Sequence, residues 1–157
     1  MSDQDHLTNR AAHRSFDAAR FSWDGVPVRA YKNGEGPYRD VTRNVLFEAE
    51  PELPIEWRYF NVAPGGWSTL ERHQHIHWVM IARGHGQALI DRAIRTVAAF
   101  DLIRIPPMSW HQFRAAPDSD LGFLCVVAAE RDRPQLPSQD DLAALSAVSE
   151  IAEFIRP

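Results

Sequence analysis

Short segments of alternating apolar and polar residues make up most of the chain and predict a β-rich fold. Side chains alternate between the two faces of a strand, so this period of two is typical of strands with one buried face. Turn residues separate the segments at intervals of roughly 8–12 residues, as in β-sandwiches and β-barrels. The expected strands are 23–30, 41–48, 55–62, 71–84, 87–90, 94–98, 101–105, 111–114 and 121–129, with a tight turn at 63–66.

The two ends of the chain show different patterns. The first 20 residues are mostly polar and predict a tail, in which residues 10–20 could form a short helix. Near the other end, apolar residues recur at helical spacing after Ser138, a residue type that often begins a helix. We therefore expect a tail at 1–20, an all-β domain at 21–137 and a C-terminal amphipathic helix within 138–157.

Residues 121–129 are apolar on both faces of the predicted strand, which is typical of a central strand covered on both sides. Trp78 and Met80 should also face away from the interior of the domain. Apolar residues on an outer face need a cover, which the C-terminal helix or a second copy of the chain could provide. We expect a homodimer.

Composition narrows the function classes. The chain has 157 residues, 45% of them hydrophobic, a net charge of -4 and a single cysteine, Cys125. It has no basic block, no apolar run of about 20 residues and no apolar core of a signal peptide, so we expect neither a nucleic-acid nor a membrane partner. One cysteine cannot form an intrachain disulfide and suits a reducing compartment. The prediction is a cytoplasmic protein with a small-molecule substrate.

The chemistry concentrates between residues 71 and 77. Glu71, His73, His75 and His77 occupy alternate positions, so a continuous strand would direct all four to one face. Imidazoles and a carboxylate that converge on one point can bind a first-row transition metal, and His111 could add a ligand from a neighbouring strand. The alternatives are a row of surface histidines, an ion pair for Glu71 and a core position for His111.

The spacing of these residues resembles the first motif of the cupin superfamily. That motif runs from glycine through five residues to His-x-His, then three or four residues to glutamate and six more to glycine. Anchored on Gly65 and Gly84, it places Glu71 at the first histidine, His73 at the second and His77 at the glutamate. The spacing therefore agrees, whereas two ligand identities differ.

The second cupin motif is matched in part. Pro106 and His111 stand at its proline and histidine, whereas Met108 and Ala115 replace its glycine and asparagine. Residues 55–129 thus resemble a small single-domain cupin, and the resemblance implies a single β-barrel of the jelly-roll type.

The resemblance also implies a metal ligand set drawn from Glu71, His73, His77 and His111. A kink in the motif would turn His75 toward the rim of the barrel, whereas an unkinked strand would make it a ligand. We expect one divalent transition metal ion per subunit, which could be Fe, Mn, Ni, Co, Cu or Zn.

A metal-dependent enzyme acting on a small polar organic molecule is the favoured function, with a dioxygenase-type oxidoreductase first. The alternatives are a non-redox isomerase, lyase or decarboxylase, in which Glu71 would move a proton, and a non-catalytic binding protein. The expected substrate contacts are Arg104, Gln112, Trp67 and Phe113. Arg104 lies two residues after Leu102, so the two side chains share one face of the strand, which could be the face toward the cavity. The alternative is that Arg104 faces solvent.

Overall fold

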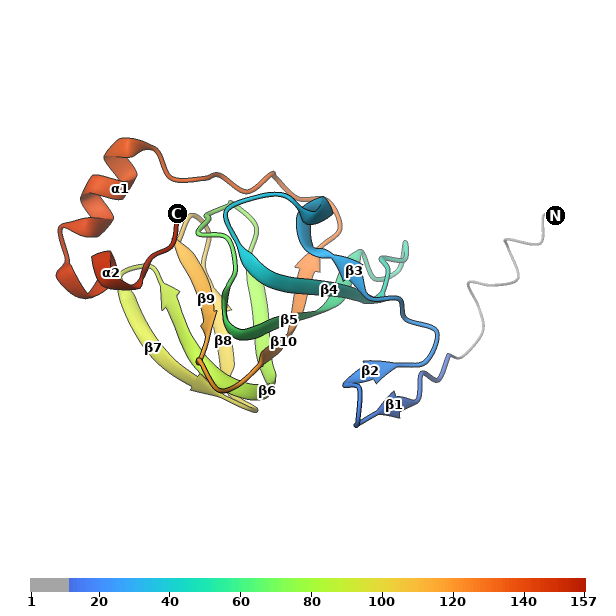
Figure 1. Cartoon of the computed structure of the whole chain (residues 1–157). Coiled ribbons are helices and arrows are strands. Elements are labelled where there is room, and N and C mark those ends of the chain that lie inside the picture. The colour runs from blue at the N-terminus through green and yellow to red at the C-terminus, as the bar shows by residue number, and fades with distance from the viewer. Residues whose placement is uncertain (1–11) are drawn as a thin grey trace.

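The computed structural model describes residues 12–157, with the side chain of Asn33 excepted, and its main body is a closed β-barrel (Figure 1). The strands are β1 (Phe16–Asp17), β2 (Ser22–Trp23), β3 (Arg29–Ala30), β4 (Arg39–Phe47), β5 (Ile55–Trp67), β6 (His77–Ile90), β7 (Ala93–Ala98), β8 (Leu102–Ile105), β9 (His111–Ala115) and β10 (Leu121–Ala128). A 3-10 turn spans Tyr31–Gly34, and two helices follow the barrel, α1 (Gln139–Ser146) and α2 (Ser149–Phe154). The expected all-β class with C-terminal helical structure is confirmed.

Antiparallel pairing closes the barrel around β6. Strand β10 pairs with both β5 and β6, and β9 pairs with β6 and meets β5 where Trp67 lies opposite Arg114. The first half of β6 also pairs with β8, and its second half pairs with β7. One long strand therefore contacts four others and carries residues to both ends of the barrel.

Gly84 lies between the two halves of β6. Its φ of +70° is in the left-handed region, and a Cβ at this position would lie 1.7 Å from the carbonyl oxygen of Asp120. Only glycine combines that backbone conformation with such a close approach. The residue therefore allows β6 to change pairing partners without breaking.

The interior of the barrel follows the alternation of the strands. Residues Phe60 and Val62 of β5 lie opposite Phe123 and Leu121 of β10, and all four are buried. Because cross-strand partners face the same side of a sheet, these positions define the inward face of both strands.

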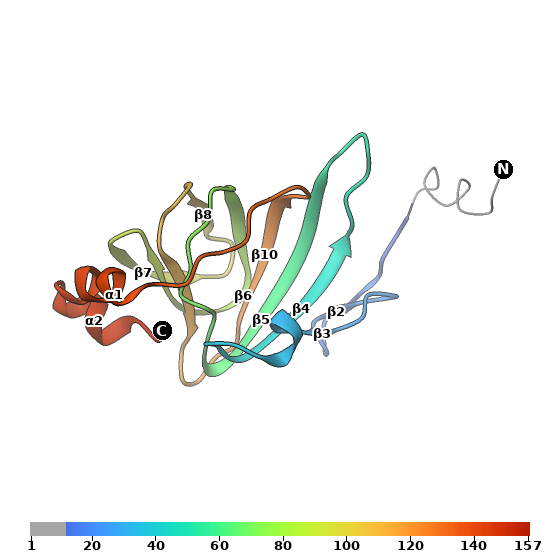
Figure 2. The same ribbon diagram turned by 90° about the horizontal axis from the view of Figure 1, so that it is seen from above.

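The C-terminal segment forms two helices instead of the single helix expected over 139–155. Ser138 and Asp141 form a reciprocal capping box at the start of α1, as the sequence indicated for Ser138. Val148 has extended backbone angles and separates α1 from α2. Both helices lie over one end of the barrel (Figures 1 and 2), where their apolar side chains pack in one cluster with the barrel. Its buried members are Leu70, Leu89, Trp110, Leu145, Ile151, Phe154 and Ile155.

The N-terminal region corrects a second expectation. Residues 16–23 form a β-hairpin, not a helix, and the hairpin lies at the end of the molecule away from α1 and α2 (Figure 2). Its aromatic side chains Phe21 and Trp23 pack against Tyr59 of β5. The expected strand 23–30 is divided between β2 and β3, and the expected turn at 63–66 is part of β5. In the described residues, no helix has the length and apolar character needed to cross a bilayer.

Candidate metal centre

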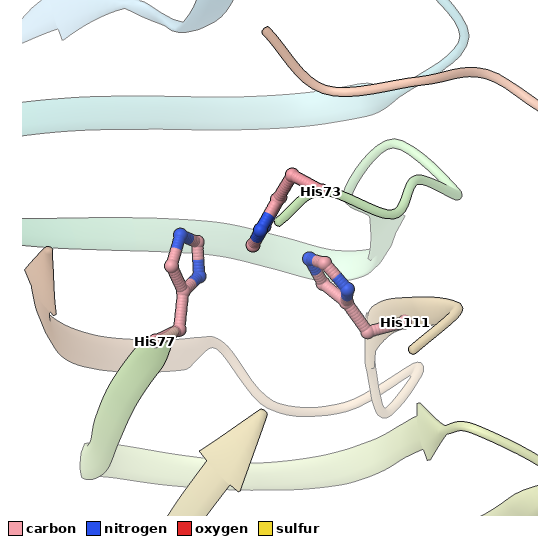
Figure 3. A group of neighbouring side chains, drawn as sticks. All are labelled: His73, His77 and His111. Atoms are coloured by element: carbon pink, nitrogen blue, oxygen red, sulfur yellow. The ribbon is translucent and has the colours of Figure 1, made fainter. Parts of the chain in front are cut away.

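Three histidines from separate parts of the chain meet at one end of the barrel. His77 begins β6, His111 begins β9, and His73 lies in the loop between β5 and β6. Their candidate ligand nitrogens lie within 4.8 Å of one another, and the three rings point toward a common centre (Figure 3). We refer to His73, His77 and His111 as the histidine triad.

The local backbone differs from the continuous strand expected over 71–77. Glu71 forms an isolated bridge with His111, and the chain then loops from His73 until β6 begins at His77. The alternate spacing still places His73 and His77 together, because the loop brings His73 back over the start of β6.

Backbone carbonyls set the orientation of two triad members. The Nδ1 of His73 lies 2.7 Å from the carbonyl oxygen of His75, and the Nδ1 of His111 lies 3.0 Å from that of Ser109. A carbonyl can only accept, so each Nδ1 donates and each Nε2 keeps its lone pair. His73 is 1% exposed, and its Nε2 has no hydrogen-bond partner among the described residues. Metal-ligating histidines typically donate their other ring N–H to a carbonyl or carboxylate in this way.

The triad is also in the protonation state that metals require. Burial lowers the pKa of His73 to about 4 and lowers the pKa values of His77 and His111 as well. The three imidazoles are therefore neutral near pH 7, and neutral imidazole is the ligand form. Together with the unpartnered Nε2 of His73, this donor set fits a divalent transition metal.

His75 lies beside the triad. Its ring stacks on that of His73 with centroids 3.6 Å apart, and its Nε2 lies 3.2 Å from the Nε2 of His77. Asp132 accepts from the backbone N–H groups of Gln74 and His75 and lies 2.8 Å from the Nδ1 of His75. Asp132 thus fixes the loop that carries His73, whereas the ligand role of His75 stays a prediction.

Glu71 lies on the other side of the triad and is only 7% exposed. Its Oε1 is 3.9 Å from the Nε2 of His111, and its Oε2 forms a salt bridge with Lys32. The ion pair that was the alternative for Glu71 is therefore present, with a lysine as partner. A carboxylate in this position can exchange a proton with a molecule in the pocket.

Two members of the triad, His77 and His111, line a pocket of about 110 Å³ inside the barrel. A water molecule needs roughly 10–15 Å³ on this measure, so the pocket has room for a small organic molecule. Its lining includes His75, His77, His111, Glu71, Tyr31, Ser68, Thr69 and Cys125, the apolar residues Val41, Phe60, Phe113, Phe123 and Pro134, and the cationic residues Lys32, Arg43, Arg58 and Arg131.

These four cationic residues were not predicted from the sequence. Arg58 could have been recognised, because it shares its parity with the apolar residues Phe60 and Val62, which face inward on the same strand. Arg131 lies in the segment between β10 and α1, which carries no regular pattern, so nothing in the sequence indicated it.

The four expected substrate contacts do not share one place. Phe113 lines the pocket. Gln112 is fully buried, but its amide bonds to the backbone of Ser68 and Arg156, so it ties the C-terminal segment to the barrel. Trp67 lies at the end of β5 under the guanidinium of Arg39 and is not part of the pocket lining.

Arg104 corrects the parity argument for β8. It lies opposite Trp78 on the exposed outer face, whereas Ile105 faces the buried side. Arg104 is therefore a solvent-facing arginine, the alternative that the sequence left open.

Comparison with known proteins agrees with this geometry. The cupin domain family matches residues 58–127. A Rhodospirillum rubrum protein named 1-methylthio-D-xylulose 5-phosphate methylsulfurylase is 55% identical over 138 residues, which cover 87% of this chain and 88% of that protein. The chain belongs to the cupin family.

Crystal structures of two cupins support the assignment. A cupin 2 conserved barrel domain protein from Rhodopseudomonas palustris is 57% identical to this cupin, with a TM-score of 0.87 over 93% of this chain and 100% of that chain. A cupin-2 domain protein from Rhodospirillum rubrum is 52% identical, with a TM-score of 0.81 over 92% of this chain and 96% of that chain.

Proposed function

We propose that this cupin is a metal-dependent enzyme acting on 1-methylthio-D-xylulose 5-phosphate or a closely similar phosphorylated methylthio sugar. The observation that carries the proposal is a pocket at which two members of the histidine triad, His77 and His111, meet a buried carboxylate. The 55% identity to a protein named for a reaction of that sugar phosphate supports the choice of substrate.

His73, His77 and His111 would hold the metal, which supplies Lewis-acid polarisation of a carbonyl or hydroxyl oxygen of the bound sugar. Glu71, through Oε1, the oxygen nearer His111, would move the proton of an acceptor thiol to the carbon that bears the methylthio group. The carbon–sulfur bond would break, the thiol sulfur would take up the methylthio group as a disulfide, and the carbon would gain the hydrogen, so the step balances. Lys32 pairs with the other oxygen of Glu71 and so orients the carboxylate. Asp132 holds His75 and the loop that positions His73.

This proposal is nearer to the non-redox alternative of the sequence analysis than to the dioxygenase that the sequence favoured. Neither the described site nor the name of the relative adds support for a reaction with oxygen. Oxygen uptake measured with the same sugar phosphate distinguishes the two, since a dioxygenase would consume oxygen in step with substrate.

The direct test is turnover by the metal-bearing protein. The protein is incubated with 1-methylthio-D-xylulose 5-phosphate, with and without a small thiol as an acceptor for the methylsulfur group, and followed by ³¹P NMR and mass spectrometry. We expect a new phosphorylated sugar that lacks the methylthio group, and none with His73→Ala. Unchanged substrate under both conditions, with protein of verified metal content, would refute the proposal.

We also propose that the protein is a homodimer. Cross-strand partners on the outer face form a continuous apolar row across four strands, made of Phe47, Trp57, Val126 and Trp78. The C-terminal helices pack elsewhere, against Leu70, Leu89 and Trp110, so they do not cover this row. A cytoplasmic location, suggested by the free and buried Cys125, stays a prediction.

A further inference from the structure

The charge of the pocket is opposite to that of the whole chain. The chain has a net charge of -4. The pocket is lined by four cationic side chains, Lys32, Arg43, Arg58 and Arg131, and by one carboxylate, Glu71. Because Lys32 is paired with Glu71, the positive charge that remains comes from the three arginines.

Arg58 is the most buried of the three, and its partners are weak. It is 8% exposed and points inward from β5, opposite Cys125 of β10. Its Nη2 donates to the Sγ of Cys125 at 3.5 Å, and its Nη1 is 4.0 Å from Glu56. Its Nε has no hydrogen-bond partner among the described residues. Burying a charge with such weak partners is costly unless a ligand completes the pairing.

Arg43 adds a second incompletely paired guanidinium. It extends from β4 opposite Phe60, two pairs along from the Val45–Arg58 pair, so it faces the same side as Arg58. Its Nε is buried and also lacks a partner within residues 12–157. Burial, followed by the charge of Arg58, lowers the pKa of Arg43, as expected for two like charges held close together.

Arg131 is held in place by residues that do not line the pocket. Its Nη2 bonds to the Oε2 of Glu56 at 2.7 Å, and its Nη1 donates to the carbonyl oxygens of Ala128 and Ala129. Glu56 is outside the pocket lining and lies close to both Arg58 and Arg131, so it anchors these side chains and offsets only part of their combined charge.

We propose that Arg43 and Arg58, with Arg131 beside them, bind the phosphate group of a phosphorylated substrate and thereby orient its reacting carbons toward the histidine triad. One guanidinium group can donate two parallel hydrogen bonds to two oxygens of the same phosphate. A phosphate monoester carries about -1.5 to -2 charges near pH 7. His77 and His111 of the triad line the same pocket as the three arginines. The phosphate site and the triad therefore belong to the same small pocket. The assignment of the anion to a sugar phosphate rests on the proposed function.

Binding of a matched pair of sugars tests this site without any turnover. Isothermal titration of the metal-bearing protein compares D-xylulose 5-phosphate with D-xylulose. We expect the phosphorylated sugar to bind at least roughly tenfold more tightly, and Arg58→Met or Arg43→Met to weaken its binding by roughly 10- to 100-fold, the loss expected for one charge-assisted hydrogen bond. The affinity for D-xylulose and the metal content should not change, and Arg58→Lys should restore part of the binding.

Arg104→Met is the matched control, because Arg104 is an exposed arginine on the outer face of the same barrel. Equal affinity for the phosphorylated sugar in wild type, Arg58→Met and Arg43→Met would overturn the proposed site. If Arg58→Met fails to fold, the half-buried Arg43 still provides the test.

The two proposals can fail separately. Arginine-dependent binding of D-xylulose 5-phosphate without turnover of the methylthio sugar would retain the phosphate site and reject the proposed function. Turnover of the methylthio sugar with a KM that does not change in Arg58→Met and Arg43→Met would retain the proposed function and reject the phosphate site.

Discussion

His73 has the most restrictive surroundings of any single residue in the site. One ring nitrogen donates to a backbone carbonyl, and the other is buried without a partner among the described residues. An unsatisfied buried acceptor costs roughly 1–3 kcal/mol, a cost that a bound metal would remove. The side chain is therefore positioned for a metal before the metal arrives.

Replacing a triad member should abolish metal binding. In His73→Ala and His111→Ala, we expect the metal content of the purified protein to fall by roughly an order of magnitude or more. The reason is that replacing even the groups that only orient metal ligands lowers metal affinity by roughly 10- to 100-fold. Elemental analysis of protein purified without added metal measures this. His85→Ala is the matched control, since His85 is exposed and pairs with Asp118 away from the triad. Full metal content in both triad variants would rule out the site.

The role of Glu71 can be separated from metal binding. An amide cannot accept a proton, so Glu71→Gln should lower kcat for the methylthio sugar phosphate by roughly 10²- to 10⁴-fold. The metal content should be retained, because His73, His77 and His111 remain. Steady-state kinetics and elemental analysis on the same preparation measure both quantities. An unchanged kcat would remove Glu71 as the proton carrier, and a loss of metal would make it a ligand instead.

The sequence could identify the triad because its spacing is local, but it could not identify the arginines. His73 and His77 are four residues apart, and His111 is indicated by its motif. Arg43, Arg58 and Arg131 come from β4, β5 and the segment after β10, and only the register of the barrel brings them together. Arg104 was predicted to be in the site but lies outside it. It does share a face of β8 with Leu102, as its spacing indicates, but only the pairing of β8 with β6 determines which face is buried.

Among the elements, α2 connects the C-terminal segment to the metal centre. Its residues Ile151 and Phe154 are buried in one cluster with Leu70 and Trp110, which immediately precede Glu71 and His111 in the chain. The bonds between Gln112 and Arg156 add a polar tie at the same place. The helix therefore supports the backbone that presents two residues of the site.

Removing this support should destabilise the whole domain. Ile151 is 1% exposed, so Ile151→Ala should lower the free energy of unfolding by about 2–5 kcal/mol, through lost burial and the cavity left behind. Urea unfolding followed by tryptophan fluorescence measures the change. Glu153→Ala in the same helix is the control, since an exposed position should change stability by about 0.5 kcal/mol or less. An equally small effect of Ile151→Ala would show that the helix is only loosely attached.

The strands were predictable where alternation was regular, and the errors occur where tertiary pairing overrides local signals. Pro64, Gly65 and Gly66 are typical turn residues, yet β5 continues through them to Trp67, which pairs with Arg39 and Arg114. Likewise, neither Gly nor Pro marks the break between α1 and α2 at Val148. The packing of two short helices over one barrel end, rather than sequence propensity, sets that break.

At the scale of the whole molecule, the outer face of the barrel is unusually apolar. Trp78, which belongs to the row with Val126 and Trp57, is 64% exposed. Leu102 lies opposite Met80, two residues along β6 from Trp78, and is 79% exposed on the same face. Large exposed apolar patches mark association surfaces in soluble proteins. A symmetric dimer would pair this patch with itself.

Placing a charge in the patch should separate the subunits. We expect Trp78→Glu to convert a dimer to a monomer of 17.9 kDa, because an unpaired carboxylate would be buried at the interface. Size-exclusion chromatography with light scattering measures the mass. Leu136→Glu changes an exposed apolar residue outside the patch and should leave the dimer intact. A monomeric wild-type protein would refute the dimer directly.

The many partners of β6 have a consequence for how the metal centre behaves over time. A strand hydrogen-bonded along its length to four neighbours should be among the last to open, so its amides should exchange with deuterium most slowly. His77 stands at the start of this strand, whereas His73 stands on a loop held by Asp132 and by the bond from the Met108 N–H to the His73 carbonyl oxygen. The amides of that loop should therefore exchange sooner than those of β6. Opening of the loop would withdraw one proposed ligand from the metal while the barrel stays folded.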